Sequence, residues 1–406
     1  MKAIKSVVLA GALDTKGREY AFVKNLIEKQ GLRTLVVDFG VMGEPGLEPD
    51  IGRAEVARAG GGDIEEMRLG RRKDAAMQIM ADGLPVIVRR LFNEGRLDGI
   101  LAMGGGGGTA IAAPAMRALP LGVPKVLVTT VGGGDVRGIV GTKDITLIQA
   151  IVDIAGINRI SGRVYTNAAG AMAGMLALEP SEIENDRPLI TASMFGNTTA
   201  CVEHARGILE DNGFEVLAFH ATGRGGRMME SMIEDGFIAA CLDVTTTELA
   251  DEVCGGGLSA GPHRCLAASR AGIPTVLVPG CVDMANFGAF DTVPEQYKDR
   301  NLYKWNPSAT LLRTNVDENR RIGQMIAAAA NAAKGPVSIV IPLRGVSMLD
   351  RVGGDFWDPE ADQACFEAIK EKLRPGIPLI ELDNNINDPE FAEKAAEILL
   401  DMLRTK

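Results

Sequence analysis

The sequence predicts an α/β protein made of two homologous halves, each a mostly parallel, doubly wound sheet with helices on both faces. Hydrophobic residues make up 46% of the 406 residues but aromatic residues only 4%, which is typical of Val, Ile and Leu strands under Ala-rich helices. Short apolar runs alternate with amphipathic stretches and end repeatedly in glycine-rich or polar loops. A chain of this length is expected to form more than one domain.

The first half is expected to alternate strands and helices from its start. Strands are predicted at residues 6–10, 34–38, 99–103 and 125–131. Helices are predicted up to residue 30, over 71–94 with an interruption or kink at Pro85, from Thr109 onwards, and through most of 150–178. Residues 40–53 are rich in Gly, Pro, Glu and Asp, which indicates a loop.

The second half repeats this alternation after a boundary expected near residue 185, so the predicted domains are 1–185 and 186–406. Strands are expected at residues 188–193, 215–220, 237–243, 310–314, 336–342 and 378–383. Helices are expected to end near 211 and 235 and to span 317–333, 359–373 and 388–403, the last of which could pack back on the first domain. Residues 285–307 are interpreted as a loop over the strand ends.

Three pairs of segments recur in the same order and support the duplication. Residues 28–40 are similar to 210–223, residues 97–109 to 234–246, and residues 122–135 to 272–284. The first half then carries an insertion between its second and third strands.

Composition and charge exclude several classes of protein. The formal net charge is −10 with no large basic block, which argues against a nucleic-acid surface. Apolar runs fall short of the ~20 residues of a membrane span, so no membrane partner is expected. The six cysteines are scattered without a Cys-x-x-Cys pair, which favours reduced thiols and a cytoplasmic location.

Five consecutive glycines follow the strand at 99–103. Glycine loses more backbone freedom on folding than other residues, and the usual reason to retain it is close approach of the backbone to a ligand. Successive amides at a helix start favour an anion, so we interpret this turn as a phosphate cradle. The expected cofactor-binding residues are Asp14, Thr15, Lys16, Gly17, Gly104, Gly105, Gly106, Gly107, Gly108, Thr109, Gly132, Gly133 and Gly134.

Two alternatives stay open for the first half. Asp14 could cap the helix that follows it while Lys16 is solvated. The cradle is neither a Walker A loop nor a full dinucleotide fingerprint, because Thr109 stands where the third glycine belongs. Asp135 or Asp144 could bind a metal that bridges phosphates, or these acids could satisfy backbone amides of a glycine-rich loop.

The second half places many polar residues at predicted strand ends. His220 could act as a general base oriented by Glu230, while Arg344 clamps an anion; a structural role for His220 is the alternative. Cys281 could be a nucleophile or a small buried hydrophobe. The expected substrate-binding residues are Asn197, Thr198, Thr199, Thr245, Thr246, Asp283 and Ser347.

The loops resemble one known family, that of the N-terminal ATP-binding inhibitory domain of the tomato mosaic virus resistance protein. The resemblance rests on GALDTKGREY, GGGGGT, TTVGGGD, SMFGNTT, HATGRGGRMME, DVTTTELADEV and GCVDMANFG, and covers essentially the whole chain. It implies two Rossmann-like subdomains with a cleft between them, ATP with Mg²⁺ on the N-terminal one, and a homodimer. It also implies that any TIM-barrel domain would be a separate partner protein. The antiviral role is not implied, because the shared motifs are pockets.

Three functions follow as hypotheses. The first is an ATP-binding protein with a second polar pocket for a small anionic metabolite. The second is an enzyme of unknown reaction, ATP-dependent or of the hydrolase or lyase type, in the C-terminal cleft. The third is a protein whose ATP state sets which partner it binds.

Overall fold

The structure is a computed structural model that describes residues 4–64, 66, 73–179 and 186–405. The chain divides into two compact units, residues 1–182 and 183–406, and each is described by itself. Both are α/β units with a parallel sheet, so the expected fold class is confirmed. Residues 180–185, where the domain boundary was expected, lie outside the described residues, as do residues 71 and 72 at the start of the expected helix 71–94.

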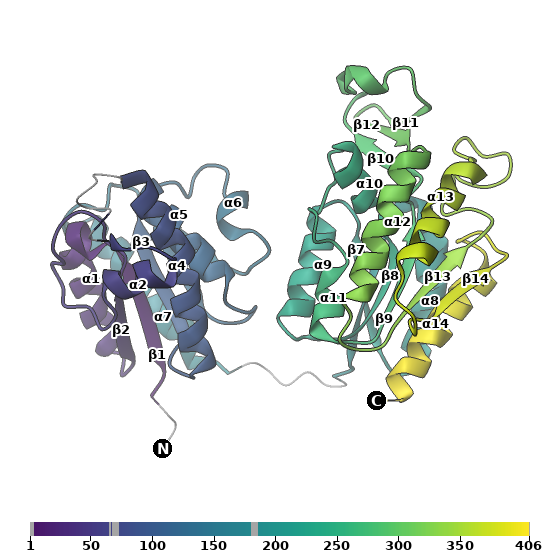
Figure 1. Ribbon diagram of the computed structural model, residues 1–406. Helices are drawn as coiled ribbons and strands as arrows, with labels where there is room; N and C mark the ends of the chain where they lie inside the picture. Colours follow the sequence, from purple (N-terminus) through teal and green to yellow (C-terminus); the bar gives the residue numbers. More distant parts are fainter. Residues whose placement is uncertain (1–3, 65, 67–72, 180–185, 406) are drawn as a thin grey trace. The chain divides into compact units, whose positions relative to one another are not determined.

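The first unit contains a five-stranded parallel sheet in the order β2-β1-β3-β4-β5, of which Figure 1 labels the first three strands. Its strands are β1 (Ser6–Gly11), β2 (Arg33–Asp38), β3 (Gly99–Gly104), β4 (Lys125–Thr129) and β5 (Thr146–Gln149). In this order the chain changes direction between β1 and β3. Ligands of open α/β sheets usually bind at the carboxyl ends of the strands at such a switch point.

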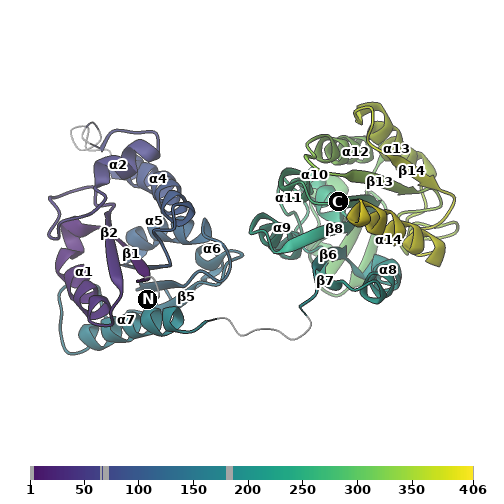
Figure 2. The same ribbon diagram turned by 90° about the horizontal axis from the view of Figure 1, so that it is seen from below.

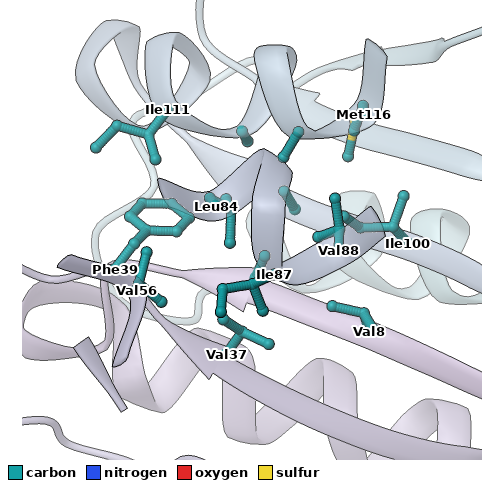
Figure 3. Close-up of a cluster of buried hydrophobic side chains, with 14 of the residues drawn as sticks. Val8, Val37, Phe39, Val56, Leu84, Ile87, Val88, Ile100, Ile111 and Met116 are labelled. Atoms are coloured by element: carbon teal, nitrogen blue, oxygen red, sulfur yellow. The ribbon is translucent and has the colours of Figure 1, made fainter. Parts of the chain in front are cut away.

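Helices cover both faces of this sheet (Figure 2). One face carries α2 (Arg53–Ala59), α4 (Lys73–Asn93) and α5 (Gly106–Arg117), and the other carries α1 (Leu13–Glu28) and α7 (Ser161–Ala177). Figure 3 shows the first of these interfaces, where Leu84, Ile87 and Val88 of α4 pack over Val8 and Val37 of the strands. The short α6 (Arg137–Val140) follows β4, and α4 runs through Pro85 without the expected interruption.

The second unit repeats the strand order of the first and extends it by one strand. Its parallel sheet has the order β14-β13-β9-β8-β6-β7. The strands are β6 (Leu189–Met194), β7 (Glu215–His220), β8 (Ile238–Thr245), β9 (Thr275–Gly280), β13 (Val337–Pro342) and β14 (Leu379–Leu382). The strands of the three similar segment pairs, β2 with β7, β3 with β8, and β4 with β9, occupy equivalent sheet positions, which agrees with the predicted repeat.

Its helices again lie on both faces. One face carries η1 (Gly196–Thr198), α8 (Thr199–Asp211) and α14 (Pro389–Arg404). The other carries α9 (Arg224–Glu234), α10 (Thr247–Cys254), α11 (Leu266–Ala271), α12 (Val316–Asn331) and α13 (Pro359–Lys372). The apolar face of the final helix α14, which the sequence left open to pack on the first domain, packs on α8 and on the sheet of its own unit.

The segment interpreted as a loop contains much of a second sheet. Strands β10 (Met284–Phe287), β11 (Leu302–Asn306) and β12 (Ala309–Arg313) form an antiparallel sheet, joined by the short 3₁₀ turns η2 (Phe290–Thr292) and η3 (Glu295–Tyr297). The hydrophobic periodicity is weak there because β11 is half exposed. No helix in the described residues is long and apolar enough to cross a membrane.

Candidate functional site

A pocket of about 160 Å³ lies at the carboxyl edge of the first sheet, at the switch point between β1 and β3. It is formed by the start of α1, the loop after β2, the end of β3 and the start of α5, together with one side chain of α4. The pocket is lined by Ala12, Asp14, Thr15, Lys16, Phe39, Val41, Met42, Met77, Met103, Gly104, Gly107, Gly108 and Ile111. Its lining combines an apolar wall with the backbone of the glycine run.

The glycine run is the start of a helix. Gly104 ends β3, Gly105 is the N-cap, and Gly106 begins α5, three residues before the helix start expected at Thr109. Thr109 is buried, and its hydroxyl bonds that of Thr129 at 2.7 Å. No side chain of the described residues caps α5, and Gly106 and Gly107 are exposed. The first-turn amides are therefore open to solvent, with the positive end of the helix dipole behind them.

Neither backbone angles nor packing explain the glycines at 105, 106 and 108. None of the three has a positive φ. A Cβ added at Gly105 or Gly108 would meet no atom closer than 3.6 Å, and one at Gly106 would meet nothing within 4 Å. Gly104 differs, because its Cβ would lie 2.9 Å from the Cα of Gly108. The remaining physical reason for three unconstrained glycines is room for a ligand at the backbone.

The equivalent helix of the second unit shows the contrast. Helix α10 follows β8 as α5 follows β3, but Thr246, Thr247 and Glu248 stand at its start and are fully buried. The Glu248 carboxylate accepts hydrogen bonds from the amides of Gly223 and Gly226 at the start of α9. The second unit therefore has buried polar side chains at the start of α10, where the first unit has glycines at the start of α5.

The other residues of the predicted cofactor group divide into two sets. Asp14 Oδ2 accepts from the amides of Met42 and Gly43 at 2.8 and 3.1 Å, while Oδ1 has no hydrogen-bond partner in the described chain. Lys16 Nζ donates to the Ile154 carbonyl at 2.5 Å, so it is not simply solvated. Gly17 is buried, and a Cβ there would lie 2.6 Å from the Gly46 backbone, so packing alone explains this glycine.

Asp14 does not cap α1, which was the alternative. That task falls to Asp38 at the end of β2, whose Oδ1 accepts from the amides of Leu13 and Gly40 at 3.0 and 2.8 Å. Burial raises the pKa of Asp38, although both amides act in the opposite direction. The sequence analysis did not identify Asp38. Its position at the end of the second predicted strand could have pointed to it. Thr15 donates only a long bond to the Ala12 carbonyl, at 3.3 Å.

The two carboxylates considered for a metal are not brought together. Asp135 is exposed and paired with Arg137, whose hydrogen bonds lower the pKa of Asp135 to about 2. Asp144 pairs with Lys125 at 2.8 Å, at the amino end of β4 and thus at the edge opposite the glycine run. Nor do the described residues contain any group of three or more His, Cys, Asp or Glu arranged for a metal ion.

The second glycine cluster forms a turn after β4, next to the end of β3. The Gly134 amide donates to the Val131 carbonyl at 3.2 Å, and a Cβ at Gly132 would lie 2.8 Å from Gln149 Oε1. Gly133 would meet that oxygen only at 3.9 Å. The close contact at Gly132 is with the movable end of the Gln149 side chain, so packing does not require a glycine at either position.

A second pocket, of about 310 Å³, lies at the carboxyl edge of the second sheet. It is formed where α8 and α14 begin, together with the loop after β13. Its lining residues are Gly196, Asn197, Thr199, Ala200, Met348, Arg351, Asn385, Asn387 and Asp388. Asn197 and Thr199 were expected here. Asn385, Asn387 and Arg351 were missed, because they follow the last two strands and no motif pointed to them.

The other predicted substrate-binding residues are buried below the surface. The hydroxyls of Thr198 and Thr245 bond each other at 2.7 Å, and Thr246 donates to the Val278 carbonyl. The Ser347 hydroxyl donates to Asp283 Oδ2 at 2.8 Å. Burial, with a contribution from the nearby Asp350, raises the pKa of Asp283 to about 7. These contacts hold the strand-end loops together.

A buried ion cluster joins β8 to α10 and α11. The Arg264 guanidinium pairs with both oxygens of Asp243, at 2.5 and 2.7 Å, and with Glu248. Glu230 lies 3.6 Å from Arg264 and accepts from the Cys265 amide at 2.5 Å. Burial raises the pKa of Glu230 to about 7 despite the neighbouring guanidinium. Sequence reasoning missed Arg264.

The three predicted catalytic residues do not form one site. His220 is exposed at the end of the edge strand β7. Glu230 forms an ion pair with Arg264 and accepts a hydrogen bond from the Cys265 amide, and so does not orient His220. Arg344 is 62% exposed and paired in a two-bond contact with Asp383. Cys281 is fully buried, and burial strongly raises the pKa of its thiol, which supports the interpretation as a hydrophobe.

Comparison with known proteins identifies relatives over both units. The family described as "Uncharacterised protein family (UPF0261)" matches with its N-terminal domain over residues 5–181 and its C-terminal domain over 187–403. A "UPF0261 protein" of Clostridium tetani is 49% identical over 400 residues, which cover 98% of this chain and 99% of that protein.

Two more distant similarities complete the comparison. The "ToMV resistance protein Tm-1(GCR237)" of Solanum lycopersicum is 39% identical over 334 residues, 80% of this chain but 44% of the tomato protein. This confirms the resemblance drawn from the motifs. A solved UDP-N-acetylglucosamine 2-epimerase of Rickettsia bellii aligns over 99% of this chain and 97% of its own, with 10% identity and a TM-score of 0.24.

Proposed function

The chain belongs to the UPF0261 family, and we propose that its first unit binds ATP, with the phosphates on the uncapped first turn of α5. The observation that carries this proposal is the glycine run. Three of its glycines have ordinary backbone angles and open space where a Cβ would be, at a helix start that no described side chain caps. Exposed amides at the positive end of a helix dipole bind phosphate oxygens well.

The pocket beside this turn suits the rest of a nucleotide. Phe39, Val41 and Ile111 offer an apolar wall, and Met42 and Met77 are flexible side chains that adapt to a flat ring. The polar side chains of the lining are those of Asp14, Thr15 and Lys16. An adenine ring in the apolar part would leave the phosphates to extend toward Gly106.

Mg²⁺ is the metal that usually accompanies such phosphates, held by one or two carboxylates together with phosphate oxygens. Asp14 is the residue that fits this role, because it lines the pocket and its Oδ1 lacks a hydrogen-bond partner in the described chain. Asp144 is unsuited because it lies at the opposite sheet edge, bonded to Lys125. The metal would screen the charge of the phosphates in a pocket whose nearest ammonium, Lys16, is held by Ile154.

Thermal unfolding and calorimetry of the full chain test the proposal with ATP, ADP, AMP and adenosine. ATP at 100 times its dissociation constant is expected to stabilise the folded state by about 2.7 kcal/mol. Affinity is expected to fall as phosphates are removed, because the cradle binds the phosphates. Absence of binding by every nucleotide would contradict the proposal, and so would equal affinity for ATP and adenosine.

An ATP-dependent reaction is not part of this proposal, because His220, Glu230 and Arg344 do not share a site. The homodimer and the separate TIM-barrel partner remain expectations of the family resemblance. Light scattering coupled to size-exclusion chromatography tests the first, with a mass near 86 kDa, twice 43.0 kDa, as the dimer result.

A further inference from the structure

We propose that the second unit holds a separate site for a small molecule that carries an oxyanion on a hydroxylated carbon chain, either a polyol phosphate or a hydroxy acid. The site is the pocket at the starts of α8 and α14. The inference names the ligand class for this pocket from its own residues and does not depend on nucleotide binding in the first unit.

The preference for an anion comes from two helix starts and one cation. Helices α8 and α14 pack side by side and both begin at the pocket, and neither is capped by the side chain of its own N-cap residue, Thr198 or Asp388. Of the first-turn amides of α8, that of Cys201 donates to the Asn387 side chain. Arg351 lines the same pocket, is exposed, and has no carboxylate partner within the described chain. A guanidinium near two helix N-termini favours a carboxylate or phosphate group.

The preference for hydroxyl groups comes from Asn197. This side chain is 1% exposed and lines the pocket, and its Oδ1 has no hydrogen-bond partner among the described residues. Its Nδ2 contacts the sulfur of Met284 at 3.3 Å, so the amide oxygen is the group in need of a donor. A buried acceptor without a partner calls for a donor, and a ligand hydroxyl supplies one.

Most of the other polar side chains that line the pocket already form hydrogen bonds within the protein. Asn387 donates to the Asn197 carbonyl at 2.9 Å and accepts from the Cys201 amide, while Asn385 donates to three loop carbonyls. Asp388 is the carboxylate of the lining, and its Oδ2 accepts from the Asn385 amide at 2.8 Å. Asp388 Oδ1 can accept a hydrogen bond from a second hydroxyl of the ligand. This also favours a ligand that carries hydroxyl donors in addition to its negative charge.

Calorimetry on the full chain with four small molecules tests separately whether binding needs the anionic group and whether it needs the hydroxyl groups. Glycerol 3-phosphate and D-glycerate carry both groups, whereas inorganic phosphate carries only the anion and glycerol only the hydroxyls. At least one of the first two is expected to bind about tenfold more tightly than phosphate, with glycerol weaker still, since charge-assisted bonds dominate. The member that binds more tightly identifies the phosphate or the carboxylate as the natural anion.

Variants then locate the binding. Arg351→Gln is expected to weaken binding about tenfold, while Arg320→Gln, at an exposed arginine of α12 paired with Asp317, is expected to change nothing. Asn197→Leu is expected to remove the advantage of the hydroxylated probe over phosphate. If Asn197→Leu unfolds the second unit because Asn197 is buried, binding to Arg351→Gln, at an exposed position, is the deciding measurement.

Three results would overturn the inference. They are equal binding of all anionic probes, unchanged binding in Arg351→Gln, and loss of binding in Gly106→Asp, which alters only the first unit. Since Gly106→Asp is also the variant that should strongly weaken ATP binding, failure of either site is distinguishable from failure of the other.

Discussion

Placing a carboxylate inside the proposed phosphate cradle is the sharpest test of the first unit. In Gly106→Asp the new side chain stands at the first position of α5, where a Cβ meets nothing within 4 Å. Helix α10 of the second unit likewise carries a carboxylate, Glu248, in its first turn. Gly106→Asp therefore replaces a ligand anion with one that belongs to the chain.

The expected effects on stability and on binding have opposite signs. A carboxylate in the first turn stabilises a helix by about 0.3–1 kcal/mol, and replacing an unconstrained glycine adds roughly 0.4–1 kcal/mol. The unliganded first unit is therefore expected to unfold about 2–4 °C higher for each kcal/mol gained. Two unit charges 4 Å apart near a protein surface repel by about 4 kcal/mol, so ATP affinity is expected to fall at least about a hundredfold.

Thermal unfolding without ligand and calorimetry with ATP measure the two effects on the same samples. The matched control is Gly170→Asp in α7, an exposed glycine of the same unit whose Cβ would also meet nothing within 4 Å. It adds the same charge away from the pocket and should leave ATP affinity unchanged. If Gly106→Asp binds ATP as tightly as the parent chain, the phosphates do not lie on this turn and the reasoning fails.

Three further predictions concern the second unit. Burial raises the pKa of Glu230 to about 7, so the free energy of unfolding falls as the pH rises from 4.5 to 7. In urea titrations, Glu230→Gln should be as stable as the parent chain at pH 4 and up to about 3 kcal/mol more stable at pH 8. If the unfolding free energy of the variant depended on pH as that of the parent does, this prediction would be refuted. Arg264→Met leaves Asp243 and Glu248 buried without a cation and should cost about 3–5 kcal/mol in the same assay, whereas a loss below 1 kcal/mol would mean that the cluster relaxes. The Trp305 side chain lies close to Gly196, which lines the second pocket. Glycerol 3-phosphate should therefore change the tryptophan fluorescence of the parent chain but not that of Trp305→Phe. An equal change in both proteins would contradict this and would assign the signal to Trp357.

The parallel strands were predictable because each is a short, fully buried apolar run. β1 and β3 are buried along their whole length, and such strands stand out from the polar loops at their ends. The order of similar segments also predicted that both halves share one strand order. Asn197 and Asp14 each line a pocket of the structure, as their position directly after the first strand of each half suggested, while their role in binding remains a prediction.

What failed depends on contacts between distant residues. Arg264 gains its role from Asp243 and Glu248, which lie 21 and 16 residues away and face it only after folding. Helix α5 begins at Gly106 although glycine disfavours helices, so local preference placed its start too late. Asp144 follows a glycine-rich loop in the sequence, but the chain crosses the sheet before reaching it, and its partner Lys125 stands at the far edge.

The distribution of the thiols makes the two units separately observable. All six cysteines lie within residues 201–365, and all are buried and form no disulfide. A thiol-specific alkylating reagent can therefore label the chain only when the second unit opens, since the first contributes no sulfhydryl. Counting labels by mass spectrometry while fluorescence or circular dichroism follows the whole molecule would give each unit its own opening rate, without engineered probes.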